Sequence, residues 1–168
     1  MTESFVVPEL TLGLRNFAAP GALGDVHAKY FGTLLDARRA AAIASRWNSR
    51  VSAFDADRLD ATIRVTLAGL ANERYPRSAP DQRALTAQLE DACGDLFEAL
   101  EALGPAQRAV LEETDDSCRP VRWQEWVASL REVFAAADRG WEQMQPLLSS
   151  APVPPGRSGR GRRREREA

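Results

Sequence analysis

The chain has 168 residues, of which 44% are hydrophobic and 27% are charged. This composition is typical of one globular domain with a proper core and argues against a fully disordered chain or a membrane protein. The net charge of −2 is unevenly distributed, because six arginines and two glutamates give residues 156–168 a charge of +4 and leave −6 on the rest.

We expect residues 1–24 to form an extended N-terminal arm. Leu10, Leu12 and Leu14 alternate with period two, while frequent proline and glycine residues disfavour a long regular element. The apolar residues through which the arm would bind a partner include Phe5, Val7 and Leu10. Two alternatives stay open: the arm packs on this protein's own helices, or it docks on a partner.

The same residues argue against a secretory signal, since they hold no basic stretch and Pro8 interrupts their apolar run. No later apolar run approaches the length that spans a membrane. The chain has two cysteines, Cys93 on an apolar helical face and Cys118 in a predicted loop, which gives a disulfide little support. We therefore expect a cytoplasmic protein without membrane association.

The first half of the chain predicts two helices. Apolar residues recur at helical spacing from Asp25, a suitable N-cap, to Val51, and the alanine-rich middle favours a helix. The stretch Phe54-Asp55-Ala56-Asp57 interrupts the pattern. Asp57 is then a suitable cap for a second helix that extends to about Glu73.

Two further helices follow. Ser78 is a good N-cap for a helix with an apolar face from Leu85 to Leu103. Gly104 suits the position after a helix end and Pro105 the first position of the next helix. We predict that the helix ends there and that a short helix runs on to about Glu113.

An exposed acidic turn is predicted over residues 114–120. Asp115 and Asp116 lie at its centre, and here too two alternatives remain. Either the carboxylates are simply solvated, or they meet a basic partner.

The longest predicted helix covers Val121–Leu148, where apolar residues recur in steps of three and four. Three of the four tryptophans lie on it, and its middle, Leu130–Ala137, is assigned to the core. Its ends carry either core or partner-binding side chains, and both alternatives stay open. The residues concerned are Trp123, Trp126, Trp141 and Met144.

Residues 149–168 predict a proline-rich linker followed by a disordered basic tail. The tail either keeps the chain in solution, contacts the phosphates of a nucleic acid, or binds an anionic protein. The candidate nucleic-acid-binding residues are Arg157, Arg160, Arg162, Arg163, Arg164 and Arg166.

We find no motif for catalysis or for metal binding. His27 is the single histidine, and no serine stands in a Gly-x-Ser-x-Gly context. The stretch from Asp55 to Asp60 imitates a calcium loop, but it lacks glycine at loop position six and has Thr66 at position twelve. We expect no catalytic residue, no cofactor and no metal.

Together these patterns predict an all-α fold: a single bundle of about five helices over residues 25–148, between the arm and the tail. By elimination we expect a non-catalytic protein–protein interaction protein, such as an adaptor, a chaperone-like protein or an assembly subunit, that binds a protein partner or itself. The alternative is a nucleic-acid-associated accessory protein that uses the arginine-rich tail. A third class is an enzyme with carboxylates inside the bundle.

Overall fold

Six helices make up residues 23–152, the part of the chain that the computed structural model describes. Their bounds are α1 Gly24–Ile43, α2 Trp47–Ser52, α3 Ala56–Arg74, α4 Ala79–Ala92, α5 Gly94–Glu112 and α6 Arg119–Ser150. No strand occurs in this range, and all helices but α2 have at least 14 residues, which confirms the predicted all-α bundle of about five helices. None of the six combines the length and apolar character that a membrane-spanning helix needs.

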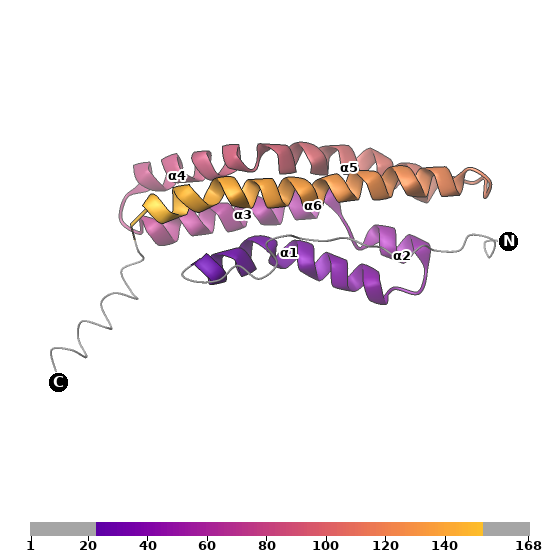
Figure 1. The fold of residues 1–168 in the computed structure, drawn as a ribbon, viewed down its shortest axis with the longest axis horizontal. Coiled ribbons are helices and arrows are strands. Elements are labelled where there is room, and N and C mark those ends of the chain that lie inside the picture. Colours follow the sequence, from indigo (N-terminus) through magenta and orange to yellow (C-terminus); the bar gives the residue numbers. More distant parts are fainter. Residues whose placement is uncertain (1–22, 153–168) are drawn as a thin grey trace, which may run out of the picture.

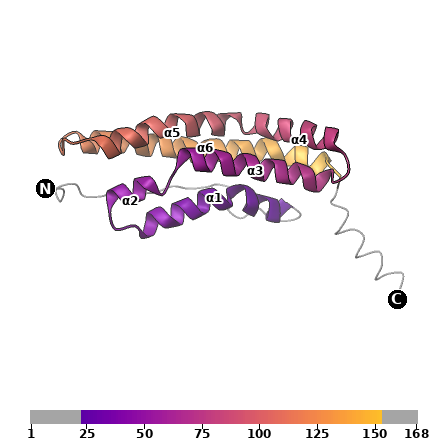
Figure 2. The same cartoon turned by 180° about the vertical axis from the view of Figure 1, so that it is seen from behind.

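The chain runs up and down the bundle, so that α1, α3, the α4–α5 pair and α6 alternate in direction (Figure 1). The ion pair between Lys29 Nζ and Glu73 Oε1, 2.7 Å apart, joins the start of α1 to the end of α3. The Arg74 guanidinium donates to the Pro152 carbonyl oxygen at 3.4 Å, which places the ends of α3 and α6 together. Figure 2 shows the short α2 beside the C-terminal end of α1.

The longest helix, α6, packs on α4 and α5 and carries much of the core. Trp123, Trp126 and Trp141 are each at most 2% exposed. Burial of an aromatic side chain removes about 150–250 Å² from water, or about 4–6 kcal/mol at 25 cal/mol per Å². The predicted Trp helix is therefore confirmed, with bounds two residues wider at each end.

The first predicted helix is wrong in one respect, because residues 44–46 interrupt it. Ala44 is extended, and the Arg50 side chain donates to the Ala44 carbonyl oxygen at 3.0 Å. After this break, α2 directs Val51 into the core, where it is fully buried. Tertiary packing outweighs the local preference of the alanine-rich sequence for one continuous helix.

The predicted stop at Gly104 and Pro105 is also wrong, since α5 runs through both residues. Leu103 and Val110, on either side of them, are fully buried. An unbroken helix keeps both side chains in the core, and this packing stabilises it. Pro105 has no N–H to donate to the carbonyl group of Glu101, and both residues are exposed.

The interruption occurs instead at Cys93, between α4 and α5. Its φ of −97° and ψ of 13° depart from the helix, while its N–H still donates to the Leu89 carbonyl oxygen at 3.1 Å. The predicted N-caps of α3 and α4 have different outcomes. Ser78 caps α4 as predicted, but Asp55 rather than Asp57 caps α3, accepting the Arg58 N–H at 3.2 Å.

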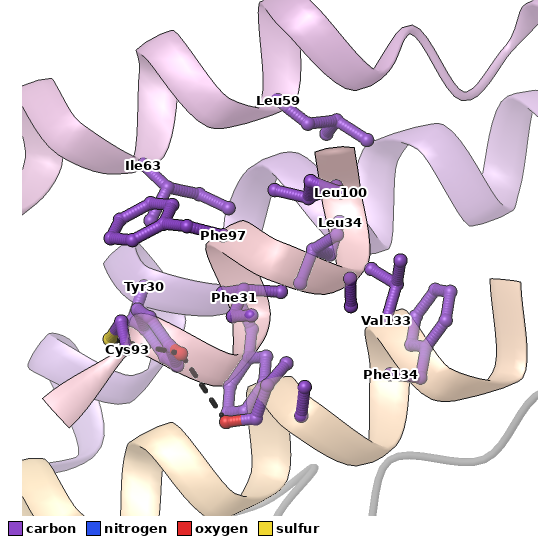
Figure 3. Close-up of a cluster of buried hydrophobic side chains, with 14 of the residues drawn as sticks. Tyr30, Phe31, Leu34, Leu59, Ile63, Cys93, Phe97, Leu100, Val133 and Phe134 are labelled. Atoms are coloured by element: carbon purple, nitrogen blue, oxygen red, sulfur yellow. Dashed lines mark hydrogen bonds between the residues drawn. The ribbon is translucent and has the colours of Figure 1, made fainter. Parts of the chain in front are cut away.

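Gly140 of α6 allows three helices to come close together. A Cβ atom at this position would lie 2.7 Å from the Tyr30 hydroxyl oxygen of α1 and 3.3 Å from the Cys93 sulfur. The Tyr30 hydroxyl donates to the Ala137 carbonyl oxygen at 3.3 Å, and Cys93 lies beside Tyr30 (Figure 3). Both side chains are buried, so neither can yield without losing its contacts.

We predict that Gly140→Ala lowers the free energy of unfolding by about 1–3 kcal/mol, the usual cost of overpacking a core. The control is Gly69→Ala in α3, where an added Cβ meets nothing within 4 Å. This control is neutral or stabilises by up to about 1 kcal/mol, because alanine is the better helix former. Urea unfolding followed by tryptophan fluorescence measures both, and equal midpoints for the two variants would contradict the prediction.

Candidate functional site

The aromatic ends of α6 lie inside the protein. Trp123, Trp126, Trp141 and Met144 are all buried, at 2%, 0%, 1% and 0% exposure. Of the two alternatives for these residues, the structure therefore supports the core. These four side chains are therefore not on the surface that a partner of this bundle would meet.

His27 is buried between aromatic rings of the core. Its ring centroid lies 4.4 Å from that of Phe31 and 4.9 Å from that of Trp141. Burial lowers the pKa of His27, and the nearby charge of Asp138 opposes this effect. At neutral pH the imidazole is therefore uncharged and serves as a packed ring.

Cys93 is likewise a packing residue. Burial raises the pKa of its thiol to about 11, so the sulfur stays protonated at neutral pH. The sulfur lies 3.4 Å from the Tyr30 hydroxyl oxygen and 3.4 Å from the Met144 sulfur. A protonated, enclosed thiol is a poor nucleophile, and Cys118, exposed at the other end of α6, forms no disulfide with it.

Asp115 shapes the acidic turn between α5 and α6. Its Oδ1 accepts the hydroxyl of Ser117 at 2.7 Å and the N–H of the same residue at 2.9 Å. These hydrogen bonds, the one from the Ser117 side chain above all, lower the pKa of Asp115. The carboxylate thus closes the turn as well as facing solvent.

Asp116 is tied to the bundle by Arg119, which is only 6% exposed. The Arg119 guanidinium pairs with Asp116, donates to the Glu113 carbonyl oxygen, and lies over the Trp47 ring with Cζ 4.7 Å from the centroid. One buried cation thereby joins the turn to α2. Both predicted partner-binding aspartates have contacts inside the protein, and their binding role stays a prediction.

A pocket of about 350 Å³ lies between α3 and α5. Its apolar members, Ala56, Phe97 and Leu100, are buried side chains of the core. Its charged members are Asp57, Asp60, Arg64, Glu98 and Glu101. We call this set of eight residues the α3–α5 pocket.

The α3–α5 pocket is acidic, with four carboxylates against one guanidinium. Arg64 lies over the Phe97 ring, its Cζ 3.9 Å from the centroid, and donates to Asp60 Oδ1 at 2.7 Å. Asp57, Glu98 and Glu101 are exposed and form no ion pair with any other residue of the range 23–152. Three carboxylates are thus available to a cation from outside.

Sequence reasoning missed this pocket. It assigned Asp57 to a helix cap and rejected Asp55–Asp60 as a calcium loop, without giving these carboxylates another role. The sequence does contain a signal for it: two amphipathic helices each carry a pair of acidic residues three positions apart, Asp57 with Asp60 and Glu98 with Glu101. This spacing places the two members of a pair on one face of their helix. The two pairs meet because α3 packs on α5. This packing belongs to the tertiary structure and cannot be seen in either helix alone.

Other predicted residues lie outside the described range 23–152. They are Phe5, Val7 and Leu10 of the arm and Arg157, Arg160, Arg162, Arg163, Arg164 and Arg166 of the tail. Within the described range, no group of three or more His, Cys, Asp or Glu side chains is arranged to hold a metal ion.

Comparison with known proteins finds no family model, no curated protein and no solved structure that matches this chain.

We predict that the free energy of unfolding falls as the pH decreases through about 6.5, the ordinary pKa of histidine. Because the folded-state pKa of His27 is lowered, the unfolded chain binds the proton more readily in this window, and acid favours unfolding. His27 is the single histidine, so His27→Phe, which keeps an aromatic ring, should flatten the dependence between about pH 5.5 and 7. Urea titrations at several pH values measure it, and an unchanged slope in the variant would contradict the prediction.

Proposed function

We propose that this chain is a non-catalytic protein-interaction module, of the adaptor or assembly-subunit kind, and that the α3–α5 pocket receives an arginine- or lysine-bearing segment of its partner. The observation that carries this proposal is the trio Asp57, Glu98 and Glu101 beside a buried apolar surface. These carboxylates are exposed and have no ion-pair partner among residues 23–152.

The pocket offers two kinds of contact to a basic side chain. Its carboxylates accept charge-assisted hydrogen bonds, and a guanidinium can engage a carboxylate through two of them. Its apolar members suit the methylene stems of arginine or lysine. Arg64 already illustrates this chemistry, because it stacks on Phe97 and pairs with Asp60.

The expected affinity is modest. An exposed ion pair contributes about 0.2–1 kcal/mol, so three of them supply about 1–3 kcal/mol. Salt screens such pairs over about 8–10 Å at physiological ionic strength. We therefore expect a transient, salt-sensitive complex in which charge selects the partner and speeds its arrival.

The charge of the pocket favours a basic protein over a nucleic acid at this place. Phosphate groups would be repelled by the three exposed carboxylates, and residues 1–155 as a whole carry −6. The nucleic-acid alternative rests on the arginines of residues 156–168, which lie outside the described range.

Self-association has less support from the described surface. The exposed large apolar side chains are Ile43, Val65, Leu111 and Val121. They lie on four different helices, and apolar residues scattered singly are normal on a monomer.

We predict that Glu98→Gln with Glu101→Gln weakens binding of a fluorescein-labelled peptide of alternating arginine and serine by about 2- to 30-fold at low salt, the equivalent of two exposed ion pairs. Asp91→Asn with Glu112→Gln makes the same change in charge on exposed residues outside the pocket and serves as the control. Fluorescence anisotropy measures both. An equal loss in the control, or no binding by the unmodified protein at low salt, would contradict the proposal.

Deletion of Gly156–Ala168 tests the two functions against each other. Under our proposal, the shortened protein binds the peptide as tightly as the full chain or more tightly, because six competing arginines are gone. Retention of the full chain on double-stranded DNA at low salt, lost on deletion, together with no binding of the peptide, would favour the accessory-protein alternative.

A further inference from the structure

Arg64 places a guanidinium group of this chain itself in the α3–α5 pocket. Its Cζ lies 3.9 Å from the centroid of the Phe97 ring, and its Nε donates to Asp60 Oδ1 at 2.7 Å. A second carboxylate oxygen, Glu90 Oε2, lies 3.8 Å from its Nη1. Proteins bind an arginine from outside through the same contacts, namely stacking on an aromatic face and pairing with carboxylates. Arg64 therefore holds the place that suits an arginine of a partner.

The contacts that hold Arg64 are weak, because its ion pairs are open to water. Its side chain is 43% exposed, and neither of its carboxylate partners is buried. Arg119, which stacks on Trp47, is different: its side chain is 7% exposed, and it also donates to a backbone carbonyl group. Exposed ion pairs contribute little to stability. Arg119 thus serves the fold, whereas Arg64 can leave its place at small cost.

Arg64 also covers the aromatic face that a second guanidinium would need. The Phe97 ring is 9% exposed while the Arg64 guanidinium lies over it. The side chain that covers this face is itself at the surface, so its movement uncovers the ring without opening the core. Two guanidinium groups cannot stack on the same face at once. A ligand that stacks on Phe97 from this side therefore competes with Arg64.

Helix geometry places a further carboxylate next to this position. On α5, Phe97 and Glu101 are four residues apart, so their side chains are neighbours on one face of the helix. Asp60 of α3 already reaches the guanidinium that lies over the ring. A guanidinium at this position can therefore pair with a carboxylate of either helix.

On the premise that the α3–α5 pocket binds a basic segment, we propose that Arg64 is an autoinhibitory contact: an arginine of the partner displaces it, stacks on Phe97 and takes over the pairing with Asp60. Once Arg64 has left, all charged groups of the pocket are carboxylates. The pocket selects arginine over lysine, because a guanidinium is planar and weakly hydrated, whereas an ammonium group is a strongly hydrated point charge.

Arg64→Ala tests the displacement in the anisotropy experiment with the labelled arginine–serine peptide. We expect this variant to bind about 3- to 30-fold more tightly than the unmodified protein at low salt, because one ion pair and one cation–π contact become available without competition. Arg64→Met is the matched control, since it removes the same charge but keeps an unbranched chain that can cover the ring. Arg64→Ala should bind about 2- to 5-fold more tightly than this control.

Two further measurements separate stacking from charge. Arg58→Ala removes a positive charge from an exposed position of α3 that does not line the pocket, and it should strengthen binding less than Arg64→Ala does. A peptide with lysine in place of arginine should gain less from Arg64→Ala than the arginine peptide does. Urea unfolding of each variant shows whether it remains folded.

Equal affinities of Arg64→Ala and Arg64→Met overturn the displacement, and so does an equal gain in Arg58→Ala. An equal gain for the lysine peptide overturns the selection of arginine. If the unmodified protein binds the peptide and loses affinity with Glu98→Gln and Glu101→Gln, while Arg64→Ala gives no gain, only the role of Arg64 is contradicted. If neither the unmodified protein nor Arg64→Ala binds the peptide, the proposed function is contradicted as well.

Discussion

The contact at Gly140 fixes the spacing of the bundle. At this point α1, α6 and the junction of α4 with α5 meet, and the Tyr30 hydroxyl fills the space that any other residue's Cβ would take. The stacked pair of Tyr30 and Trp141, with centroids 6.1 Å apart, and the ring of His27 lie in the same region. The separation of α1 from α6 is therefore set by aromatic rings. The polar atoms of these rings are buried, whether or not they have hydrogen-bond partners.

Sequence patterns predicted the parts of the fold that depend on residues close in sequence. The three- and four-residue steps of α6 and the cap at Ser78 are local features, and both were confirmed. The helix break at Cys93 and the unbroken passage through Gly104 and Pro105 were not predicted, because both are decided by what packs against α5. Local propensity alone gives no measure of that packing.

The candidate site was less predictable than the fold. The acids at Asp57, Asp60, Glu98 and Glu101 were visible as polar faces, but their assembly into one pocket needs the pairing of α3 with α5. Arg119 is a similar case. Nothing near it in the sequence marks it as buried, since its aromatic neighbour Trp47 lies on α2, 72 positions earlier. The spacing of hydrophobic residues does not predict which charged residues are buried between distant elements.

The two cysteines differ in a way that makes them reporters of different states. Cys118 is exposed at the start of α6, whereas Cys93 is enclosed beside Tyr30 and Met144 with its proton retained. A thiol reagent thus reaches Cys118 in the folded protein but Cys93 only when the junction of α4 and α5 opens. Cys118 can therefore carry a label on the folded protein. The rate at which Cys93 reacts would measure how often the junction of α4 and α5 opens.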